Sequence, residues 1–285
     1  MPVSHLTDRA VIRVAGLEAK PFLDRLITCD LDRVSVGAPR FGALLTPQGK
    51  ITADFIVWEA EERAYLLDVS RACAPDLIKR LNLYKLRARL TIGDITGECA
   101  VFAGWNAPLP PMALSAPDPR VAALGWRAVA APSSIGADAS RDDYDTHRVA
   151  VGVPEGGRDF AFGDAFPHEA LMDQMAGVDF DKGCYVGQEV VSRMQHRGTA
   201  RTRIVPLDYE GDAAEPGAAV TAGERTLGET GSAAGSRGLA TIRIDRAADA
   251  LAEGVPILAG GRPVRLRKPE WVRFPFPGEP ASSAA

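Results

Sequence analysis

The sequence predicts an α+β protein that ends in a small antiparallel β-barrel. In the first hundred residues, apolar runs of strand character come in hairpins with single amphipathic helices between them, which favours α+β over a wound parallel sheet. The clearest hairpin joins Phe41–Leu45 to Ile51–Trp58 through Thr46-Pro47-Gln48-Gly49-Lys50, with Pro early and Gly late in the turn. After residue 200, short alternating runs separated by Gly, Pro and Asp predict the barrel or a sandwich.

The other N-terminal elements follow from the same patterns. Residues 17–29 have apolar side chains at helical spacing, from Phe22 to Ile27. Pro75 can open a second helix, because the first turn of a helix leaves that N–H without a partner anyway. Further strands are predicted at 11–14, 65–69, 89–95 and 99–105.

Changes in composition divide the chain into four parts. The Pro-rich stretch 106–111 marks a boundary, and the capping residues after Arg141 predict a helix that Gly152 ends. The predicted parts are an N-terminal α+β lobe, a second α+β lobe, a β-barrel and a flexible tail, at residues 1–105, 106–199, 200–274 and 275–285.

Composition excludes several classes of protein. Hydrophobic residues make up 46% and charged residues 25% of the 285, which excludes a disordered chain. The formal net charge of −4 gives no support to a nucleic-acid partner. Apolar runs fall far short of the roughly 20 residues that cross a bilayer, and the first residues lack the pattern of a secretory signal. We therefore expect a cytoplasmic protein with reduced thiols, no membrane partner and a monomeric state.

The segment 181–193 is the most informative stretch of the chain. A glycine-bent loop leads into the first turn of a helix, where Gln188 and Glu189 suit the helix dipole. This places Cys184 ahead of a helix N-terminus with Lys182 two residues away, and both features favour a thiolate. Two interpretations stay open, a functional thiol and a small apolar cysteine packed in a loop.

The other cysteines predict no site. Cys29, Cys73 and Cys99 have apolar surroundings that indicate buried thiols. No C-x-x-C pair occurs, and the zincin-like start at His168-Glu169 lacks its second His, so no metal site is predicted.

Two further groups each allow two interpretations. Arg193, Arg197, Arg201 and Arg203, with His196, form either a solvated helix face or a docking patch for a small polyanion. Asp54, on an otherwise apolar strand, either faces water or lines a pocket for a cationic or N–H-bearing heterocycle.

Eight consecutive residues carry a family resemblance. Lys182-Gly183-Cys184-Tyr185-Val186-Gly187-Gln188-Glu189 resembles the K-G-C-[FY]-x-G-Q-E signature of the YgfZ family of folate-binding proteins, which are similar to the aminomethyltransferase (T-protein) of the glycine cleavage system. Arg148–Pro154 resembles the R-x-x-x-G-[IV]-P segment of that family, and Leu44–Asp54 resembles its L-L-T-P-Q-G-K hairpin. Pro167 and Glu169 resemble the P-x-E that precedes the signature.

The resemblance implies a ring of two α+β lobes and a C-terminal antiparallel β-barrel. It also implies tetrahydrofolate, or a derivative, as cofactor, and a role in assembling or repairing iron–sulfur proteins, with Lys182 and Cys184 as the functional pair. Asp54 matches the aspartate with which T-proteins position the folate amine. The expected folate contacts are Asp54, Arg148, Glu169, Tyr185, Gln188 and Glu189.

Three functional hypotheses follow. The first is a tetrahydrofolate-binding accessory factor for iron–sulfur proteins that uses the thiol of Cys184. The second is a folate-dependent aminomethyl or methyl transferase that uses Asp54. The third is a non-enzymatic scaffold that docks a partner protein through the basic run from Arg193 to Arg203. The sequence assigns no reaction.

Overall fold

The computed structural model describes residues 1–198 and 200–279, and the chain forms two compact units from interleaved segments. Unit 1 contains Met1–Tyr144, Phe162–Pro167 and Met175–Arg193. Unit 2 contains Asp145–Ala161, His168–Gln174 and the chain from Met194 onward. The domain limits expected from composition stay predictions.

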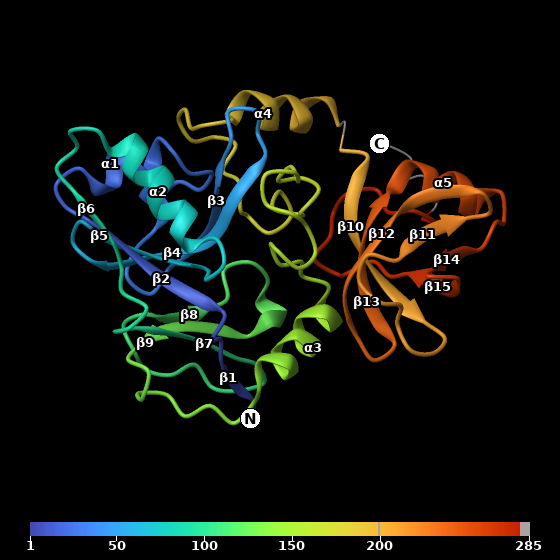
Figure 1. Ribbon diagram of the computed structural model, residues 1–285, viewed down its shortest axis with the longest axis horizontal. Coiled ribbons are helices and arrows are strands. Elements are labelled where there is room, and N and C mark those ends of the chain that lie inside the picture. Colours follow the sequence, from blue (N-terminus) through green and yellow to red (C-terminus); the bar gives the residue numbers. More distant parts are fainter. Residues whose placement is uncertain (199, 280–285) are drawn as a thin grey trace. The chain divides into compact units, whose positions relative to one another are not determined.

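A five-stranded antiparallel sheet forms one part of unit 1, in the order β3-β4-β5-β2-β6 (Figure 1). Its strands are β2 (Arg9–Ala15), β3 (Arg40–Leu45), β4 (Ile51–Glu61), β5 (Ala64–Ser70) and β6 (Thr91–Asp94). Helices α1 (Ala19–Asp24) and α2 (Ala74–Lys85) contribute Phe22, Leu77 and Leu81 to the same apolar core as Phe55 and Val57 of β4. Because strand side chains alternate, Asp54, Ile56 and Trp58 lie on the opposite face of this sheet.

A second, four-stranded sheet of unit 1 has the order β1-β7-β9-β8. Its strands are β1 (Val3–His5), β7 (Ala100–Gly104), β8 (Ser115–Pro117) and β9 (Trp126–Ala130). Phe102, Trp126 and Ala128 form its core. Gly104 has to be glycine, since a Cβ there would collide with the indole ring of Trp126.

Buried ion pairs connect the two sheets of unit 1. Asp68 on β5 accepts a 2.6 Å bond from Nε of Arg9, and the Nε of Arg127 on β9 lies 3.4 Å from Asp68. Arg127 also reaches Asp118, 3.7 Å away, which pairs with Arg120 at 2.7 Å. Burial raises the pKa of Asp118, but the charge and hydrogen bonds of Arg120, together with the charge of Arg127, outweigh burial and lower the pKa on balance.

Unit 2 is built around a closed antiparallel barrel in the order β10-β13-β12-β11-β14-β15 (Figure 1). Its strands are β10 (Thr202–Tyr209), β11 (Ala219–Ala222), β12 (Arg225–Ala234), β13 (Arg237–Arg243), β14 (Ile257–Ala259) and β15 (Arg262–Leu266). Apolar side chains of these strands, such as Leu207, Leu239 and Ile242, are buried. The predicted α+β class with a C-terminal antiparallel barrel is confirmed.

The remaining elements are short. They comprise helices α3 (Arg141–Val151), α4 (Gln188–Arg197) and α5 (Ile244–Ala252), with single 3₁₀ turns η1 (Leu31–Arg33) and η2 (Ala122–Leu124). Helix α5 interrupts the strands of the barrel after β13, and it buries Ala247 and Ala250.

The helix expected over residues 17–29 is much shorter in the structure, where α1 ends at Asp24. Thr28 takes up bonds outside the helix: its backbone N–H donates to Ala43 and its hydroxyl donates to Gly177. Leu26 and Ile27 are still buried, so the apolar spacing indicated burial correctly but not helix length.

The predicted mobile tail is ordered in its first part. Phe276 is buried, and Glu279 pairs with the ammonium of Lys268 at 2.7 Å. Residues 280–285 of that prediction lie outside the described residues.

Candidate functional site

The loop that leads into α4 is anchored to unit 1 by Lys182. Its ammonium donates to the backbone carbonyls of Asp24, Ile27 and Cys29 at 2.7, 2.9 and 2.8 Å, and lies 3.1 Å from Oδ1 of Asp24. These carbonyls follow the end of α1, where free acceptors collect. The Lys182 side chain is only 2% exposed. Lys182 therefore holds the loop in place, and the sequence spacing did not indicate this structural role.

Tyr185 is a second anchor of the loop. Its side chain is buried, and its ring centre lies 5.6 Å from the Lys182 ammonium. Burial raises the pKa of Tyr185 to about 12. Its hydroxyl has no hydrogen-bond partner among the described residues.

Two glycines bring the loop against the β3–β4 hairpin. Gly187 has φ +82°, and a Cβ there would lie 2.6 Å from the carbonyl oxygen of Thr46 and 3.1 Å from Cα of Gly49. Gly49, in the hairpin turn, also has a positive φ of +81°. Two of the segments that carry the family resemblance, the loop and the hairpin, therefore contact each other through glycines that cannot take a side chain without strain.

Cys184 is exposed, unlike the anchors beside it. Gly183 next to it has open space around the position of a Cβ. Glu189 is also exposed, and it pairs with Arg193 one helical turn later at 2.7 Å. The loop thus presents a thiol from a backbone that is fixed at Lys182, Tyr185 and Gly187.

Asp54 is buried on the face of β4 that lies opposite the core under the helices. It is close enough to Cys73 for its charge to add to the effect of burial, which raises the pKa of that thiol to about 12. Trp58, two positions further along the same face, is buried, and its indole N–H has no hydrogen-bond partner among the described residues. Trp58 was missed in the sequence, because nothing local marks which face of β4 carries polar groups.

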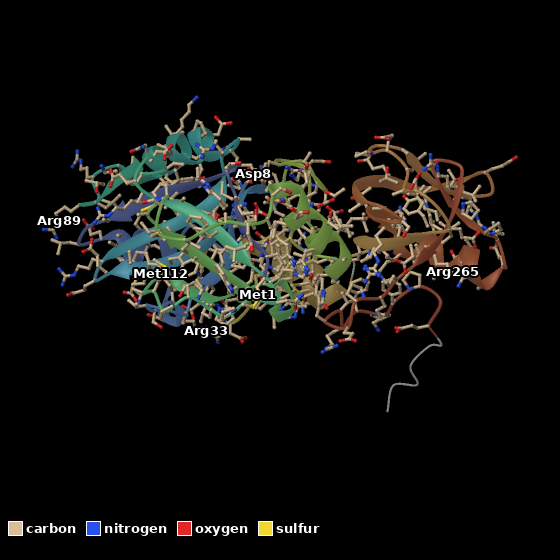
Figure 2. All side chains as sticks on the ribbon, turned by 90° about the horizontal axis from the view of Figure 1, so that it is seen from below. Met1, Asp8, Arg33, Arg89, Met112 and Arg265 are labelled. Atoms are coloured by element: carbon tan, nitrogen blue, oxygen red, sulfur yellow. The ribbon has the colours of Figure 1, made fainter. Side chains whose placement is uncertain are left out.

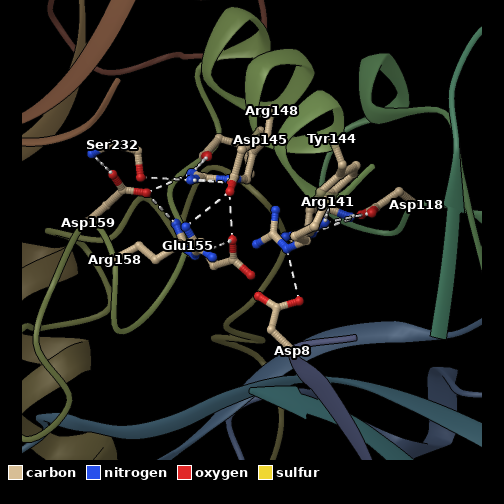
Figure 3. A network of polar contacts seen from close by, with 12 residues as sticks. Asp8, Asp118, Arg141, Tyr144, Asp145, Arg148, Glu155, Arg158, Asp159 and Ser232 are labelled. Carbon is tan, nitrogen blue, oxygen red and sulfur yellow. Dashed lines mark hydrogen bonds and ion pairs between the residues drawn. The ribbon is translucent and has the colours of Figure 1, made fainter. Parts of the chain in front are cut away.

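Arg148 belongs to a carboxylate cage inside unit 2 (Figure 3). Its side chain is 0% exposed. Its nitrogens donate to Asp145, Asp159, Ser232 and the carbonyl of Val153 at 2.6–3.1 Å, five bonds in all. A guanidinium has five N–H donors, so none is left for a ligand. This geometry corrects the expected folate contact at Arg148, which is a structural residue of unit 2.

The other residues of the segment 148–154 also have a structural role in unit 2. Gly152 has φ +88°, and a Cβ there would lie 2.7 Å from Cγ of Pro206 on β10. The end of α3 is covered by Arg267 and Trp271, whose side chains donate to the carbonyls of Ala150 and Val151. The segment therefore packs α3 against the barrel.

The expected site residues separate between the two units. Asp54, Lys182, Cys184, Tyr185, Gln188 and Glu189 lie in unit 1, and Arg148 and Glu169 lie in unit 2. Glu169 is partly buried, and its backbone carbonyl accepts from the N–H of Ile204. Their roles in binding folate stay predictions, apart from the correction at Arg148.

The basic run does not form one patch. Arg203 is buried in unit 2, where it donates to Asp173 at 2.6 Å and packs 4.6 Å from the ring centre of Phe274. Arg193 is engaged by Glu189 in unit 1. The docking patch proposed for a polyanion therefore loses two of its cations.

Asp179 is a further buried acid that the sequence did not single out. It accepts from the backbone N–H of Asp30 at 2.7 Å and pairs with Arg33 and Arg40 at 3.2 and 3.0 Å. These partners are about 140–150 residues away in sequence, and long-range pairs of this kind leave no local pattern.

Within residues 1–198 and 200–279, no group of three or more His, Cys, Asp or Glu side chains could hold a metal ion. The helices of this part of the chain are also too short or too polar to cross a membrane.

Family models match the N-terminal part of this chain and its C-terminal barrel. The GCVT N-terminal domain family matches residues 3–105, and the C-terminal β-barrel domain family of CAF17 matches residues 201–274. The human iron–sulfur cluster assembly factor IBA57, named as mitochondrial, is 33% identical over 274 residues, which cover 84% of this chain and 76% of the human one. The chain belongs to the IBA57 family.

Other relatives extend this result. The IBA57 homologue of Neurospora crassa is 34% identical over 242 residues, 75% of this chain. The chain spans only 55% of the length of that protein and 57% of the Mycosarcoma maydis homologue. The structure of the glycine cleavage system aminomethyltransferase T from Bartonella henselae has the same fold, with a TM-score of 0.74 at 15% identity over 96% of this chain and 87% of that one.

Membership of the IBA57 family confirms the expected kinship with T-protein-like folds. It also corrects the expected location. The homologues from Neurospora crassa, Mycosarcoma maydis, human and mouse are all named as mitochondrial, so the prediction of a cytoplasmic protein is wrong. That prediction rested on the lack of a secretory signal pattern and of a long apolar run, and neither observation distinguishes the cytoplasm from another compartment that keeps thiols reduced.

Proposed function

We propose that this IBA57-family protein is a tetrahydrofolate-binding accessory factor that presents Cys184 to proteins of iron–sulfur cluster assembly. The observation that carries the proposal is the contrast within one loop, where Cys184 is exposed while Lys182 and Tyr185 are buried anchors. The relatives named as iron–sulfur cluster assembly factors support the choice of partner.

The chemistry of the thiol limits what Cys184 can do. Clusters are held by several cysteine thiolates, four in the common types. The described residues contain no group of three metal-binding side chains, so Cys184 would supply one contact and a partner protein the others. This favours transient contact with a cluster or its carrier over a resident cluster.

Three buried polar side chains of unit 1 support the choice of a reduced pterin as the ligand. Asp54 is a buried carboxylate that can accept from an N–H group of the heterocycle. The indole N–H of Trp58 and the hydroxyl of Tyr185 are buried without hydrogen-bond partners among the described residues, as expected of groups whose partner is a ligand. When bound, tetrahydrofolate would supply a one-carbon carrier, and Asp54 would hold its amine.

The role of the thiol is tested in a strain that lacks the endogenous protein. We expect Cys184→Ala to restore much less iron–sulfur enzyme activity than the wild-type chain, at equal protein level. Cys99→Ala is the matched control, because Cys99 is partly buried and outside the loop. Full restoration by Cys184→Ala would contradict the thiol role.

The folate part is tested separately by titrating the purified protein with tetrahydrofolate and following its intrinsic fluorescence. We expect saturable binding that Asp54→Asn weakens about tenfold or more, from loss of a charge-assisted hydrogen bond. Asp164→Asn, at an exposed position of unit 1, should bind as the wild type does. Lack of saturable binding by the wild type would remove folate from the proposal and leave the thiol role standing.

Aminomethyl transfer is the second candidate, favoured by the burial of Asp54 within a GCVT-like domain. Its assay is formation of methylenetetrahydrofolate by the purified protein, with Asp54→Asn as control. Absence of turnover would remove this candidate.

A further inference from the structure

Unit 1 exposes an unusual number of large apolar side chains around the end of α2. Leu86 is 87% exposed, Leu83 69%, Leu17 54% and Tyr84 41%. On α2, Leu77 and Leu81 are buried, whereas Tyr84, one helical turn after Leu81, is exposed. Clustered exposed apolar residues, unlike scattered ones, mark interaction sites.

Tyr84 and Leu86 line one hollow, and Leu17 and Leu83 are the sequence neighbours of Glu18 and Tyr84, which also line it. The backbone N–H of Arg89 donates to the carboxylate of Glu18 at 2.7 Å, which places the turn after β2 beside the segment after α2. A hollow of about 390 Å³ between them is lined by Phe22, Leu26, Tyr84 and Leu86, with Arg25, Lys85 and Arg87 also around it. We call this surface, made by Leu17, Leu83, Tyr84, Leu86 and the hollow, the α2-end patch.

The patch is strongly basic within an acidic protein. Residues 79–89 contain five cations, at positions 79, 80, 85, 87 and 89, and no acidic residue. The adjacent acid, Glu18, pairs with Arg89, whose side chain projects from the surface of unit 1 (Figure 2), and the other four cations of this segment remain in excess. The whole chain carries a formal net charge of −4, so this excess of positive charge is local.

The backbone at Leu86 adds a separate observation. Leu86 follows the last turn of α2 with φ +46° and ψ −109°, a backbone conformation that residues other than glycine rarely adopt. Strained residues of this kind cluster at functional sites. Here the strained backbone directs the side chain of Leu86 into solvent, where it adds no apolar burial to the stability of the folded chain.

We propose that the α2-end patch docks the protein on an anionic membrane surface. Projecting leucines can enter the boundary between headgroups and acyl chains, and the surrounding cations meet lipid phosphates. The apolar floor at Phe22 and Leu26 offers room for part of an acyl chain. The expectation of no membrane partner rested on the lack of a spanning segment, which does not bear on binding at the surface.

Flotation of the full chain with vesicles tests the proposal. We expect the protein to float with vesicles of equal parts phosphatidylcholine and phosphatidylglycerol, to stay behind with phosphatidylcholine alone, and to be released by salt. Glycerol 3-phosphate should not compete, because a free headgroup provides no bilayer. Lys85→Gln with Arg87→Gln should weaken binding about fivefold for each charge removed.

The apolar part is tested by Leu83→Gln with Leu86→Gly, which should abolish flotation and leave the thermal midpoint unchanged or higher, since glycine relieves the strained backbone. Leu109→Gln with Leu251→Gln is the matched control, at exposed leucines outside the patch. Three results would overturn the proposal: no binding of the wild type to anionic vesicles, equal binding to neutral vesicles, or unchanged flotation of the Leu83/Leu86 variant. Capture of an acidic protein by the patch without vesicle binding would also overturn it.

Discussion

At the scale of single residues, burial and partners separate side chains that look alike in sequence. Arg148 and Cys184 both lie in family-like segments, but Arg148 is enclosed by Asp145, Glu155 and Asp159, whereas Cys184 faces solvent. Removing one member of a buried ion cluster leaves the others uncompensated, and this costs far more than the loss of an exposed pair.

Arg148→Met should therefore destabilise unit 2 by about 3–5 kcal/mol, because three carboxylates lose their central cation. Urea unfolding followed by circular dichroism measures this change. Arg158→Met provides the comparison: Arg158 pairs with two of these carboxylates, Asp145 and Glu155, but its side chain is 44% exposed, so its loss should cost less than about 1 kcal/mol. Equal effects of the two substitutions would mean that Arg148 is not the centre of the cage.

His168 gives the stability of unit 2 a pH dependence. Burial lowers the pKa of its imidazole below the ordinary 6.5, so the folded chain keeps it neutral while the unfolded chain takes up a proton. The unfolded state binds more protons as the pH falls through 6.5 toward the folded pKa, and stability falls over that interval.

His168→Gln should flatten this part of the stability profile, measured by urea unfolding between about pH 7 and about pH 5. His196→Gln, at an exposed position of α4, should leave the profile as it is. A profile for His168→Gln that keeps the wild-type slope would contradict the assignment.

At the scale of elements, the loop before α4 depends on close backbone contact with the β3–β4 hairpin. Gly187 and Gly49 meet where a Cβ would touch the backbone of the other segment, while Lys182 caps the chain after α1. The position of the Cys184 thiol thus depends on three segments of unit 1 that are distant in sequence.

Gly187 and Gly183 of this loop differ in how closely other atoms surround them, so alanine substitutions at the two positions should differ in their effect on stability. Gly187→Ala should cost about 2 kcal/mol or more, because it puts a side chain at φ +82° and 2.6 Å from a carbonyl oxygen. Gly183→Ala should change the free energy of unfolding by less than about 1 kcal/mol, since nothing lies within 4 Å of the added Cβ. Chemical denaturation of both variants measures the difference, and a tolerated Gly187→Ala would show that the loop is not seated on the hairpin.

At the scale of the whole molecule, the four cysteines differ by environment. Cys184 is exposed and Cys99 is partly buried, while burial raises the pKa of both Cys29 and Cys73 to about 12. The thiolate is the reactive form of cysteine. Burial and a raised pKa therefore both lower the reactivity of Cys29 and Cys73.

Titration with a chromogenic disulfide reagent should therefore give one fast thiol in the native protein and four in denaturant. The fast phase should disappear in Cys184→Ala and persist in Cys29→Ala. Fast labelling that survives in Cys184→Ala would place the reactive thiol elsewhere.

The sequence by itself determined the α+β class, the hairpin at residues 46–50, the terminal barrel and the identity of the motif loop, because periodicity, turn chemistry and short motifs are local properties. Only the tertiary structure decided what Arg148 contacts, that Lys182 caps residues 24–29, which face of β4 carries Asp54 and Trp58, and that Leu86 projects into solvent. Each of these depends on segments far apart in the chain. Burial and ion pairing arise when such segments pack together, and no local pattern records which partner a side chain will meet.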